Sequence, residues 1–186
     1  MKRQAFNHLY QDEVSDPLSS LGFEAIGGKS LRYSDGIRDL RFINLGGGFR
    51  KVGALRTMIC FRHQCLQPLQ KNHMEADVFD VTEFPRKLTF HDFSGAFVPP
   101  IYRSNDFHRW GYDSIEYADE AEQNVSERLK KIRVLIAERV LPWAKTLTPE
   151  SELTQIEGRG YPTWYEQKWI TDYKSYISKS ASTEDK

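Results

Sequence analysis

The chain has 186 residues, of which 26 are basic and 26 are acidic, so its formal net charge is zero. Hydrophobic residues make up 39% of it and aromatic residues 13%, which supports one sizeable core and excludes a wholly disordered chain. Two cysteines and twelve glycines exclude a disulfide framework and a collagen-like protein. These values predict an ordinary globular protein.

The first predicted element is an amphipathic helix at residues 2–21. Its apolar residues recur at nearly helical spacing: Phe6, Leu9, Tyr10, Val14, Leu18 and Leu21. Pro17 predicts a kink or an interruption, because proline lacks a backbone N–H and clashes with the preceding turn. Gly22 is typical of the left-handed residue that ends a helix.

Four strands are predicted between residues 23 and 65, where the helical spacing is lost. Segments 23–26 and 31–33 form a hairpin around the turn Gly27-Gly28-Lys29-Ser30. The third strand covers residues 37–45 and the fourth residues 55–65, with a glycine-rich connection at 46–53. Alternation in the fourth strand predicts a sheet with one covered face.

Residues 66–112 are rich in aromatic residues and contain four prolines. A further strand is plausible at 87–93, and the rest is expected to pack over the sheet edge or to form a functional loop. Helical periodicity returns at 118–147, where Pro142 is expected to bend or end a long helix.

A short helix is predicted after Thr148, which is followed by proline and early acidic residues. An aromatic helical segment follows at 161–177, and residues 178–186 form a polar, flexible tail. The predicted fold class is α+β, with residues 1–177 as a single domain. It has a mainly antiparallel sheet of four to six strands, an N-terminal helix, one long helix and C-terminal helices.

Charge is unevenly distributed along this neutral chain. Segment 29–71 contains nine basic and two acidic residues, whereas segment 113–127 contains six acidic residues and no basic one. One interpretation is that the two charges neutralise each other on solvated faces. The other is a basic sheet surface that binds an acidic partner or a phosphate backbone.

Several motifs resemble chemical sites but lack the required spacing. Residues 22–30 resemble a phosphate-binding P-loop with one glycine too many, and a hairpin turn explains them better. Gly46-Gly47-Gly48 is better explained as a flexible strand connection. Cys60, His63 and Cys65 do not provide the four converging ligands of a structural zinc site.

No cofactor and no metal is therefore predicted, and no catalytic residue is assigned. His63, His91 and His108 are the histidines that an enzyme could use, although none has a partner at a recognisable spacing. The two cysteines are expected to be reduced. Together with the absence of a signal-like apolar run after the basic N-terminus, this favours a cytoplasmic protein without a membrane segment.

Two segments resemble a family of uncharacterised bacterial α+β domains. They are the run from Asp16 to Phe23, which ends in Leu-Gly-Phe before a basic hairpin, and the run from Val140 to Lys145, which contains Leu-Pro-Trp. The resemblance implies an antiparallel sheet with flanking helices and no established catalytic residues. Some similar small domains act as immunity proteins against secreted toxins.

The leading hypothesis is a non-enzymatic cytoplasmic protein that binds another protein, and an immunity protein that neutralises a toxin by occlusion is one form of it. The candidate contact residues combine basic groups with the side chains typical of binding hot spots: Arg50, Lys51, Arg109, Trp110 and Tyr112. Core packing is the alternative explanation for the aromatic ones. There are two other hypotheses: nucleic-acid binding through the basic segment 29–71, and an uncharacterised enzymatic activity.

Overall fold

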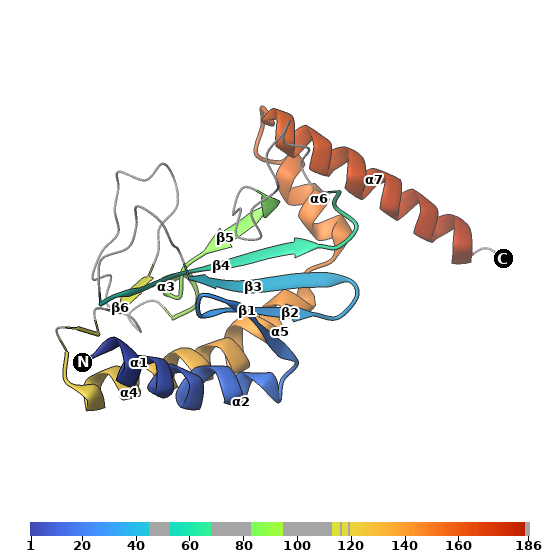
Figure 1. Cartoon of the computed structure of the whole chain (residues 1–186). Coiled ribbons are helices and arrows are strands. Elements are labelled where there is room, and N and C mark those ends of the chain that lie inside the picture. Colours follow the sequence, from blue (N-terminus) through green and yellow to red (C-terminus); the bar gives the residue numbers. More distant parts are fainter. Residues whose placement is uncertain (45–52, 68–82, 95–112, 116, 119, 185–186) are drawn as a thin grey trace.

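An antiparallel sheet packed against helices forms the body of the protein (Figure 1). The computed structural model describes residues 1–44, 53–67, 83–94, 113–115, 117–118 and 120–184. Within this part, the α+β class, the antiparallel sheet and the N-terminal, long and C-terminal helices are as predicted. No helix among these residues combines the length and apolarity needed to cross a membrane.

The N-terminal helix runs from α1 (Arg3–Tyr10) through a π-helical segment η1 (Gln11–Ser15) into α2 (Asp16–Ser19). Pro17 does not interrupt it, contrary to one form of the prediction. A wider π turn directly precedes the proline, and such turns can accommodate its ring and its missing N–H. Gly22 ends the helix with a φ of 89°, as its position predicted.

Six strands of the described chain form one sheet: β1 (Phe23–Gly27), β2 (Ser30–Ser34), β3 (Arg38–Asn44), β4 (Leu55–His63), β5 (Arg86–Leu88) and β6 (Asp113–Ile115). The order is β1-β2-β3-β4-β5, and all pairs are antiparallel. β6 also pairs with β4, at residues 55–57, whereas β5 pairs at residues 59–61. The predicted strand at 87–93 is shorter than expected, because helix α3 (His91–Ser94) follows β5.

The long helix comprises α4 (Glu122–Leu135), a second π-helical segment η4 (Ile136–Val140) and α5 (Leu141–Thr146). Pro142 follows η4 as Pro17 follows η1, and the helix again continues past the proline. Both proline-containing helices therefore combine a π turn with a proline placed just after it.

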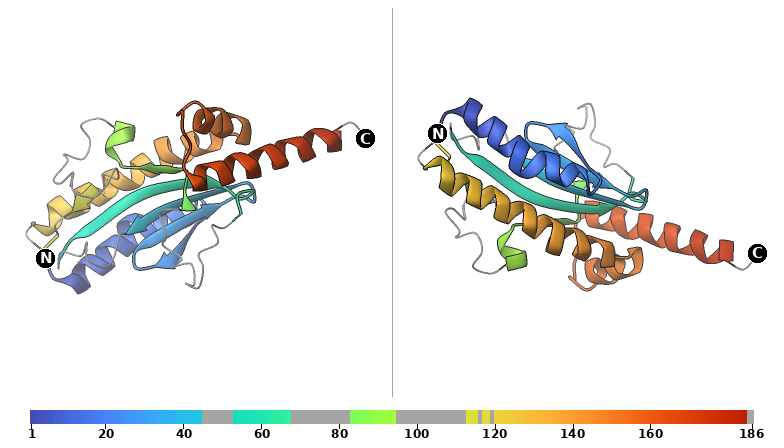
Figure 2. Two further views of the ribbon diagram at one scale, coloured as in Figure 1. Left: turned by 90° about the horizontal axis from the view of Figure 1, so that it is seen from above. Right: turned by 90° about the horizontal axis from the view of Figure 1, so that it is seen from below.

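Two C-terminal helices follow in the described part of the chain, α6 (Pro149–Glu157) and α7 (Trp164–Glu184). Thr148 begins α6 with the predicted cap, in which its Oγ1 accepts a hydrogen bond from the Ser151 N–H at 3.2 Å. α7 is longer than expected, because residues 178–184 continue the helix instead of forming the predicted tail. Its C-terminal half extends away from the rest of the molecule (Figures 1 and 2).

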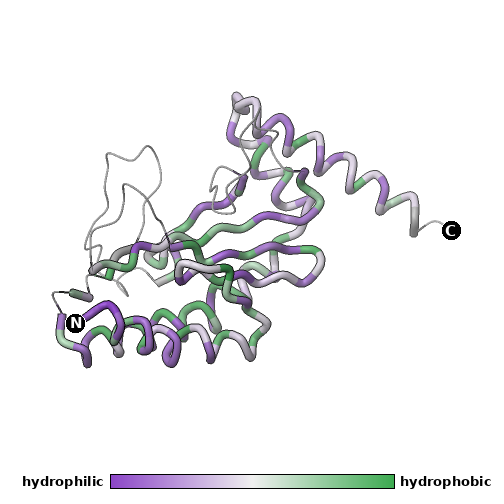
Figure 3. The backbone as a smooth tube through the Cα atoms, viewed as in Figure 1, coloured by the Kyte–Doolittle hydropathy of each residue, from purple (hydrophilic) through white to green (hydrophobic). Residues whose placement is uncertain are grey.

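The main core lies between the sheet and the paired helices α1–α2 and α4–α5, which cover one face side by side (Figure 2). Apolar and polar stretches recur along these helices (Figure 3), and their apolar side chains are buried in the same cluster as those of the sheet. The prediction that the fourth strand has only one covered face was wrong. Met58 and Cys60 on the opposite face of β4 are also buried, where they pack with Ile43 and Phe84.

Candidate binding site at the α6–α7 corner

The five contact residues expected from the sequence, Arg50, Lys51, Arg109, Trp110 and Tyr112, lie outside the described residues. His73 and His108 lie outside them as well, as does the side chain of His91. The structure therefore leaves the predicted contact set as a prediction. A different candidate site is formed by charged and aromatic residues that the structure does describe.

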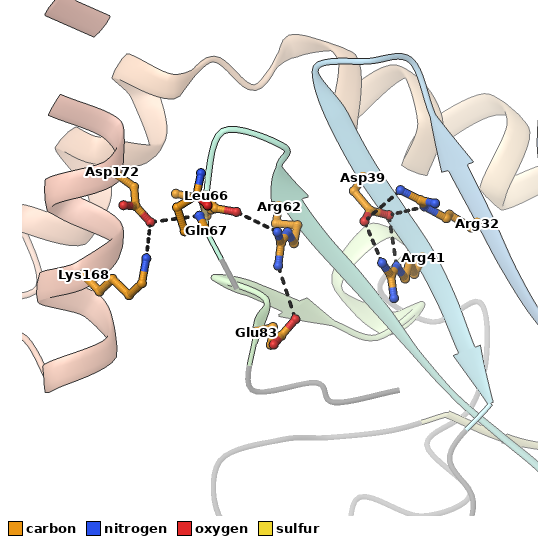
Figure 4. A network of polar contacts seen from close by, with 9 residues as sticks. All are labelled: Arg32, Asp39, Arg41, Arg62, Leu66, Gln67, Glu83, Lys168 and Asp172. Atoms are coloured by element: carbon orange, nitrogen blue, oxygen red, sulfur yellow. Dashed lines mark hydrogen bonds and ion pairs between the residues drawn. The ribbon is translucent and has the colours of Figure 1, made fainter. Parts of the chain in front are cut away.

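The basic segment 29–71 is partly neutralised by acidic residues within the sheet. Asp39 is only 3% exposed and accepts hydrogen bonds from two guanidinium groups (Figure 4). Arg41 Nη2 lies 2.8 Å from its Oδ2, and Arg32 Nε lies 3.1 Å from its Oδ1. Both arginines form ion pairs with Asp39 within the sheet, so this carboxylate neutralises part of the local positive charge.

Two further arginines of this segment also pair with carboxylates. Arg62 Nη1 lies 3.4 Å from Glu83 Oε2, and its Nη2 donates to the Leu66 carbonyl at 2.7 Å (Figure 4). Arg38 Nη1 lies 3.0 Å from Asp35 Oδ2. The acidic partners described for these four arginines are Asp39, Glu83 and Asp35, none of which belongs to segment 113–127. Local pairing reduces the charge available for a phosphate backbone.

His63 is buried at the end of β4 and joins three parts of the chain. Its Nε2 lies 3.2 Å from the Leu147 carbonyl, and its Nδ1 lies 3.1 Å from the Tyr173 hydroxyl. Since a carbonyl only accepts, Nε2 carries the proton and Nδ1 accepts from Tyr173. Burial lowers the pKa of His63, which favours the neutral ring. These contacts indicate a structural role in attaching α7 to the sheet.

Neither cysteine is an activated nucleophile, and neither belongs to a group of metal ligands within the part of the chain that the structure describes. Cys60 is buried in β4, whereas Cys65 lies past the end of the strand, so the predicted strand was too long. Burial raises the pKa of the Cys60 thiol to about 12 and that of Cys65 to about 11, which keeps both protonated. Among the described residues, no three histidine, cysteine or acidic side chains are grouped as metal ligands.

Residues 159–165 form a corner at one end of the sheet (Figure 1), and we name them the α6–α7 corner. They comprise most of the connection between α6 and α7 and the first two residues of α7. Gly160 has a φ of 91°, a conformation that glycine adopts without strain. Thr163 then begins α7: Glu166 Oε2 accepts from its N–H at 2.8 Å and from its hydroxyl at 2.7 Å. In return, the Glu166 N–H donates to the Thr163 Oγ1 at 3.4 Å, and this reciprocal cap fixes the direction in which the corner enters α7.

Aromatic side chains extend from this corner toward the interior. Tyr161 is fully exposed and Trp164 is 65% exposed, whereas Trp169, one and a half turns further along α7, is buried. Between them, the Tyr165 ring lies 5.7 Å from Trp164 and 5.2 Å from Trp169, measured between ring centroids. The Trp164 ring therefore rests on a chain of aromatic contacts that ends in a small core of Leu66, Ile156, Trp169 and Tyr173, whereas the Tyr161 ring is surrounded by solvent.

A pocket of about 250 Å³ opens beside the corner, between α7 and the edge strand β5. Residues 85–88 form one side of the pocket. The opposite side is formed by the corner and α7, which contribute Arg159, Tyr165, Glu166 and Trp169. Arg86, on the β5 side, is held by Glu152 of α6, whose carboxylate is 1% exposed. The guanidinium donates from Nη2 to Glu152 Oε1 at 2.6 Å and from Nε to Oε2 at 2.9 Å.

The charge of the pocket is mixed, with an excess of cations. Arg86, Lys87 and Arg159 line it together with one carboxylate, Glu166. Arg159 Nη1 lies 3.5 Å from Glu166 Oε1, and that pair is partly open to solvent. Burial, assisted by the positive charge of Arg159, lowers the pKa of Lys87. Aromatic walls and neighbouring charges allow this pocket to bind a small polar group.

This site was not predicted, because the pattern of residues 161–177 indicates only an aromatic helical segment. The sequence nevertheless contains a signal. In residues 159–165, an arginine, tyrosines and a tryptophan lie around one glycine and one proline. Gly and Pro in this arrangement predict a turn at the surface, and aromatic residues in a surface turn are candidates for binding.

No protein-family model, no curated protein and no solved structure matches this chain. The resemblance based on the Leu-Gly-Phe and Leu-Pro-Trp segments therefore stays a prediction.

Proposed function

We propose that this chain is a non-enzymatic protein that binds another protein through the α6–α7 corner. The observation that carries the proposal is the exposure of Tyr161 and Trp164 on a capped, aromatic-supported turn. Trp, Tyr and Arg are the residues that most often supply binding energy at interfaces. A rigid turn also loses little conformational entropy when it binds.

A toxin is the kind of partner that the family resemblance implies, and blocking it would require no nucleophile. Occlusion needs a few anchoring side chains and a complementary surface. The proposal includes a cytoplasmic setting, which the two unbonded thiols support. The enzymatic alternative gains no support from the described histidines, because His63 is engaged in packing and none of them lines the pocket.

The test is affinity capture by the tagged full-length protein from an extract of its own source cells, with a nuclease-treated sample in parallel. The variant Tyr161→Ala/Trp164→Ala removes both exposed rings. Its matched control, Tyr176→Ala/Val134→Ala, removes two exposed apolar side chains from α7 and α4. We expect a stoichiometric, nuclease-resistant protein partner that the control retains.

The corner variant should lose this partner by more than about tenfold in affinity, because one hot-spot residue already contributes about 2 kcal/mol. Equal capture by the corner variant and the wild type would contradict the proposal. Recovery of nucleic acid alone would support the second hypothesis, binding through segment 29–71, although the pairs of Arg32 and Arg41 with Asp39 argue against it.

A further inference from the structure

The first strand of the sheet, β1, carries a further inference, which does not rest on the α6–α7 corner. We propose that the outer edge of β1 binds an extended segment of another protein as an added antiparallel strand, with a basic side chain opposite Glu24. β1 and β5 lie at opposite ends of the strand order, and the pocket beside the corner is next to β5. The two surfaces are therefore separate.

The hydrogen-bond ladder determines which backbone groups of β1 point outward. In antiparallel strands, the N–H and C=O groups of successive residues point alternately to one side and to the other. The Gln64 N–H donates to the Ile37 carbonyl at 2.8 Å, so every second residue of β3 counted from Ile37 faces β4. The residues between them face β2, and accordingly the Asn44 N–H donates to Ser30 Oγ of β2 at 2.9 Å. The same alternation can be followed across β2 to β1.

The alternation leaves two residues of β1 with outward-facing backbone groups. Arg32 lies between two β2 residues that face β3, so it faces β1, where Glu24 is its partner. The N–H and C=O groups of Phe23 and Ala25 therefore point away from the sheet. Among the described residues, no backbone hydrogen bond beyond the ladder reaches them. Such groups at a sheet edge are a template for a further strand.

Exposure and a β-bulge define the length of this edge. Glu24 and Ala25 are exposed, whereas the register shifts between Ala25 and Gly27. A bulge bends its strand and interrupts regular pairing. Proline and lysine, which often protect open edges, do not occur in the sequence of β1. The edge can therefore accept a short strand that pairs with residues 23–25.

Charge favours a basic segment over a second copy of this chain. A strand bonded to Phe23 and Ala25 places one residue opposite Glu24 in a pair without hydrogen bonds, where side chains approach most closely. Within the described part of the chain, the Glu24 carboxylate forms no ion pair, and its neighbour Arg32 is bound to Asp39. A lysine or arginine would complement this charge. Two copies bonded in the same way would place Glu24 opposite Glu24, and like charges in that position are unfavourable.

The other face of β1 favours apolar residues on both sides of the basic one. Phe23 is buried in the main core, and the centroid of its ring lies 5.6 Å from that of Tyr33. Residues of an added strand opposite Phe23 and Ala25 would lie on this face, because side chains alternate along a strand. They would extend the apolar surface of the sheet. The expected pattern of the bound segment is therefore apolar, basic, apolar.

The experiment uses the full-length protein labelled with ¹⁵N and the peptide acetyl-Thr-Val-Lys-Val-Thr-amide as the probe. In the free protein, the N–H groups of Phe23 and Ala25 should be less protected from hydrogen exchange than that of Glu24, which the ladder holds. The peptide should shift these signals saturably in the millimolar range and slow the exchange at Phe23 and Ala25. The peptide with glutamate in place of lysine should bind about fivefold more weakly.

N-methylation of the peptide separates strand addition from other kinds of binding. Methyl groups on the two valine nitrogens remove the donors that would face β1, so the affinity should fall about tenfold or more. A methyl group on the lysine nitrogen, which would face away from β1, should change the affinity less than about twofold.

Substitutions in β1 locate the site. Glu24→Lys changes an exposed side chain and should reverse the preference, so that the glutamate peptide binds more tightly than the lysine peptide. Ala25→Pro removes an outward N–H without removing a ladder bond, and it should weaken binding of both peptides. Tyr161→Ala/Trp164→Ala is the control and should bind the lysine peptide as the wild type does. Circular dichroism and urea unfolding check that each variant is folded.

Four outcomes would overturn the inference: no saturable shift with the lysine peptide, equal binding of the lysine and glutamate peptides, equal binding of the two methylated peptides, or the same preference in Glu24→Lys as in the wild type. A wild-type dimer that Ala25→Pro dissociates in sedimentation would replace the partner segment by a second copy and would also overturn it. Failure of the proposed function is distinguished separately, because it is measured by capture with the corner variant.

Discussion

The core beneath the sheet and the α6–α7 corner use aromatic residues in opposite ways. Between the sheet and helices α1–α2 and α4–α5, rings such as Phe6 and Phe61 are completely buried in one large apolar cluster. At the corner, Trp164 is mostly exposed, and charged residues line the pocket beside the buried Trp169. The difference indicates that the first region supplies most of the stability. Exposed side chains of the second region can be substituted with little change in the free energy of unfolding.

The largest expected effect is the loss of a ring from the main core. Phe61→Ala should lower the free energy of unfolding by about 3–5 kcal/mol, because it removes buried apolar surface and leaves a cavity. Urea denaturation followed by circular dichroism measures this loss. Val134→Ala, which truncates an exposed side chain, should change stability by less than about 0.5 kcal/mol. A similar loss in both variants would contradict the assigned burial.

A smaller but substantial effect is expected where the C-terminal helices attach to β5. Glu152→Ala leaves Arg86 without its bidentate partner and should cost about 3 kcal/mol, as for other largely buried pairs. The exposed pair of Glu157 and Lys174 provides the control, since Glu157→Ala should cost about 0.5 kcal/mol or less. If the two variants unfold at the same urea concentration, the Arg86–Glu152 pair does not stabilise this attachment.

The attachment of α7 should also weaken in mild acid. Burial lowers the pKa of His63, so the folded state resists protonation while the unfolded chain binds a proton near the ordinary pKa of 6.5. Stability should therefore be constant above about pH 6.5 and fall below it, by at most about 1.4 kcal/mol per pH unit for one proton. Nearby Arg38 opposes protonation as well, whereas Glu150 and Asp35 favour it.

Denaturation curves between pH 7 and pH 5 test this dependence. His63→Gln should make the profile flatter in that range, although it lowers stability at pH 7. His8→Gln, at an exposed position of α1, should leave the profile as it is. Asp35 and Glu166 have lowered pKa values, so their contribution is lost only at a lower pH, as the pH falls through those values. An unchanged slope in His63→Gln would show that another group is responsible.

The smallest effect on stability is expected at the α6–α7 corner. Tyr161→Ala should change the free energy of unfolding by less than about 0.5 kcal/mol, because the ring is fully exposed. Thermal and urea unfolding of this variant should overlay the wild type. A clear loss of stability would mean that Tyr161 contributes to folding and would weaken the contrast with the main core.

Much of the fold was predictable from local signals. The N-terminal helix, the glycine that ends it, the first hairpin and the cap at Thr148 all lie within a few residues of the predicted positions. Each depends on interactions between residues close in sequence, such as a side chain that accepts a hydrogen bond from a nearby N–H. Of the alternatives that these signals left open at the prolines, an interruption at Pro17 and an end at Pro142 do not occur, because the compensating π turns have no evident signature in the sequence.

The candidate site was predictable only in its residue types. Trp164 and Trp169 belong to one aromatic helix, and periodicity places them on different sides of it. Which side is buried depends on the packing of α7 against Leu66 and α6, and the pocket requires β5, distant in sequence, to lie beside the corner. The sequence by itself determined the elements, their caps and the turn at 159–163. The tertiary structure decided which rings remain in solvent and which charges share a cavity, because burial depends on contacts between distant segments.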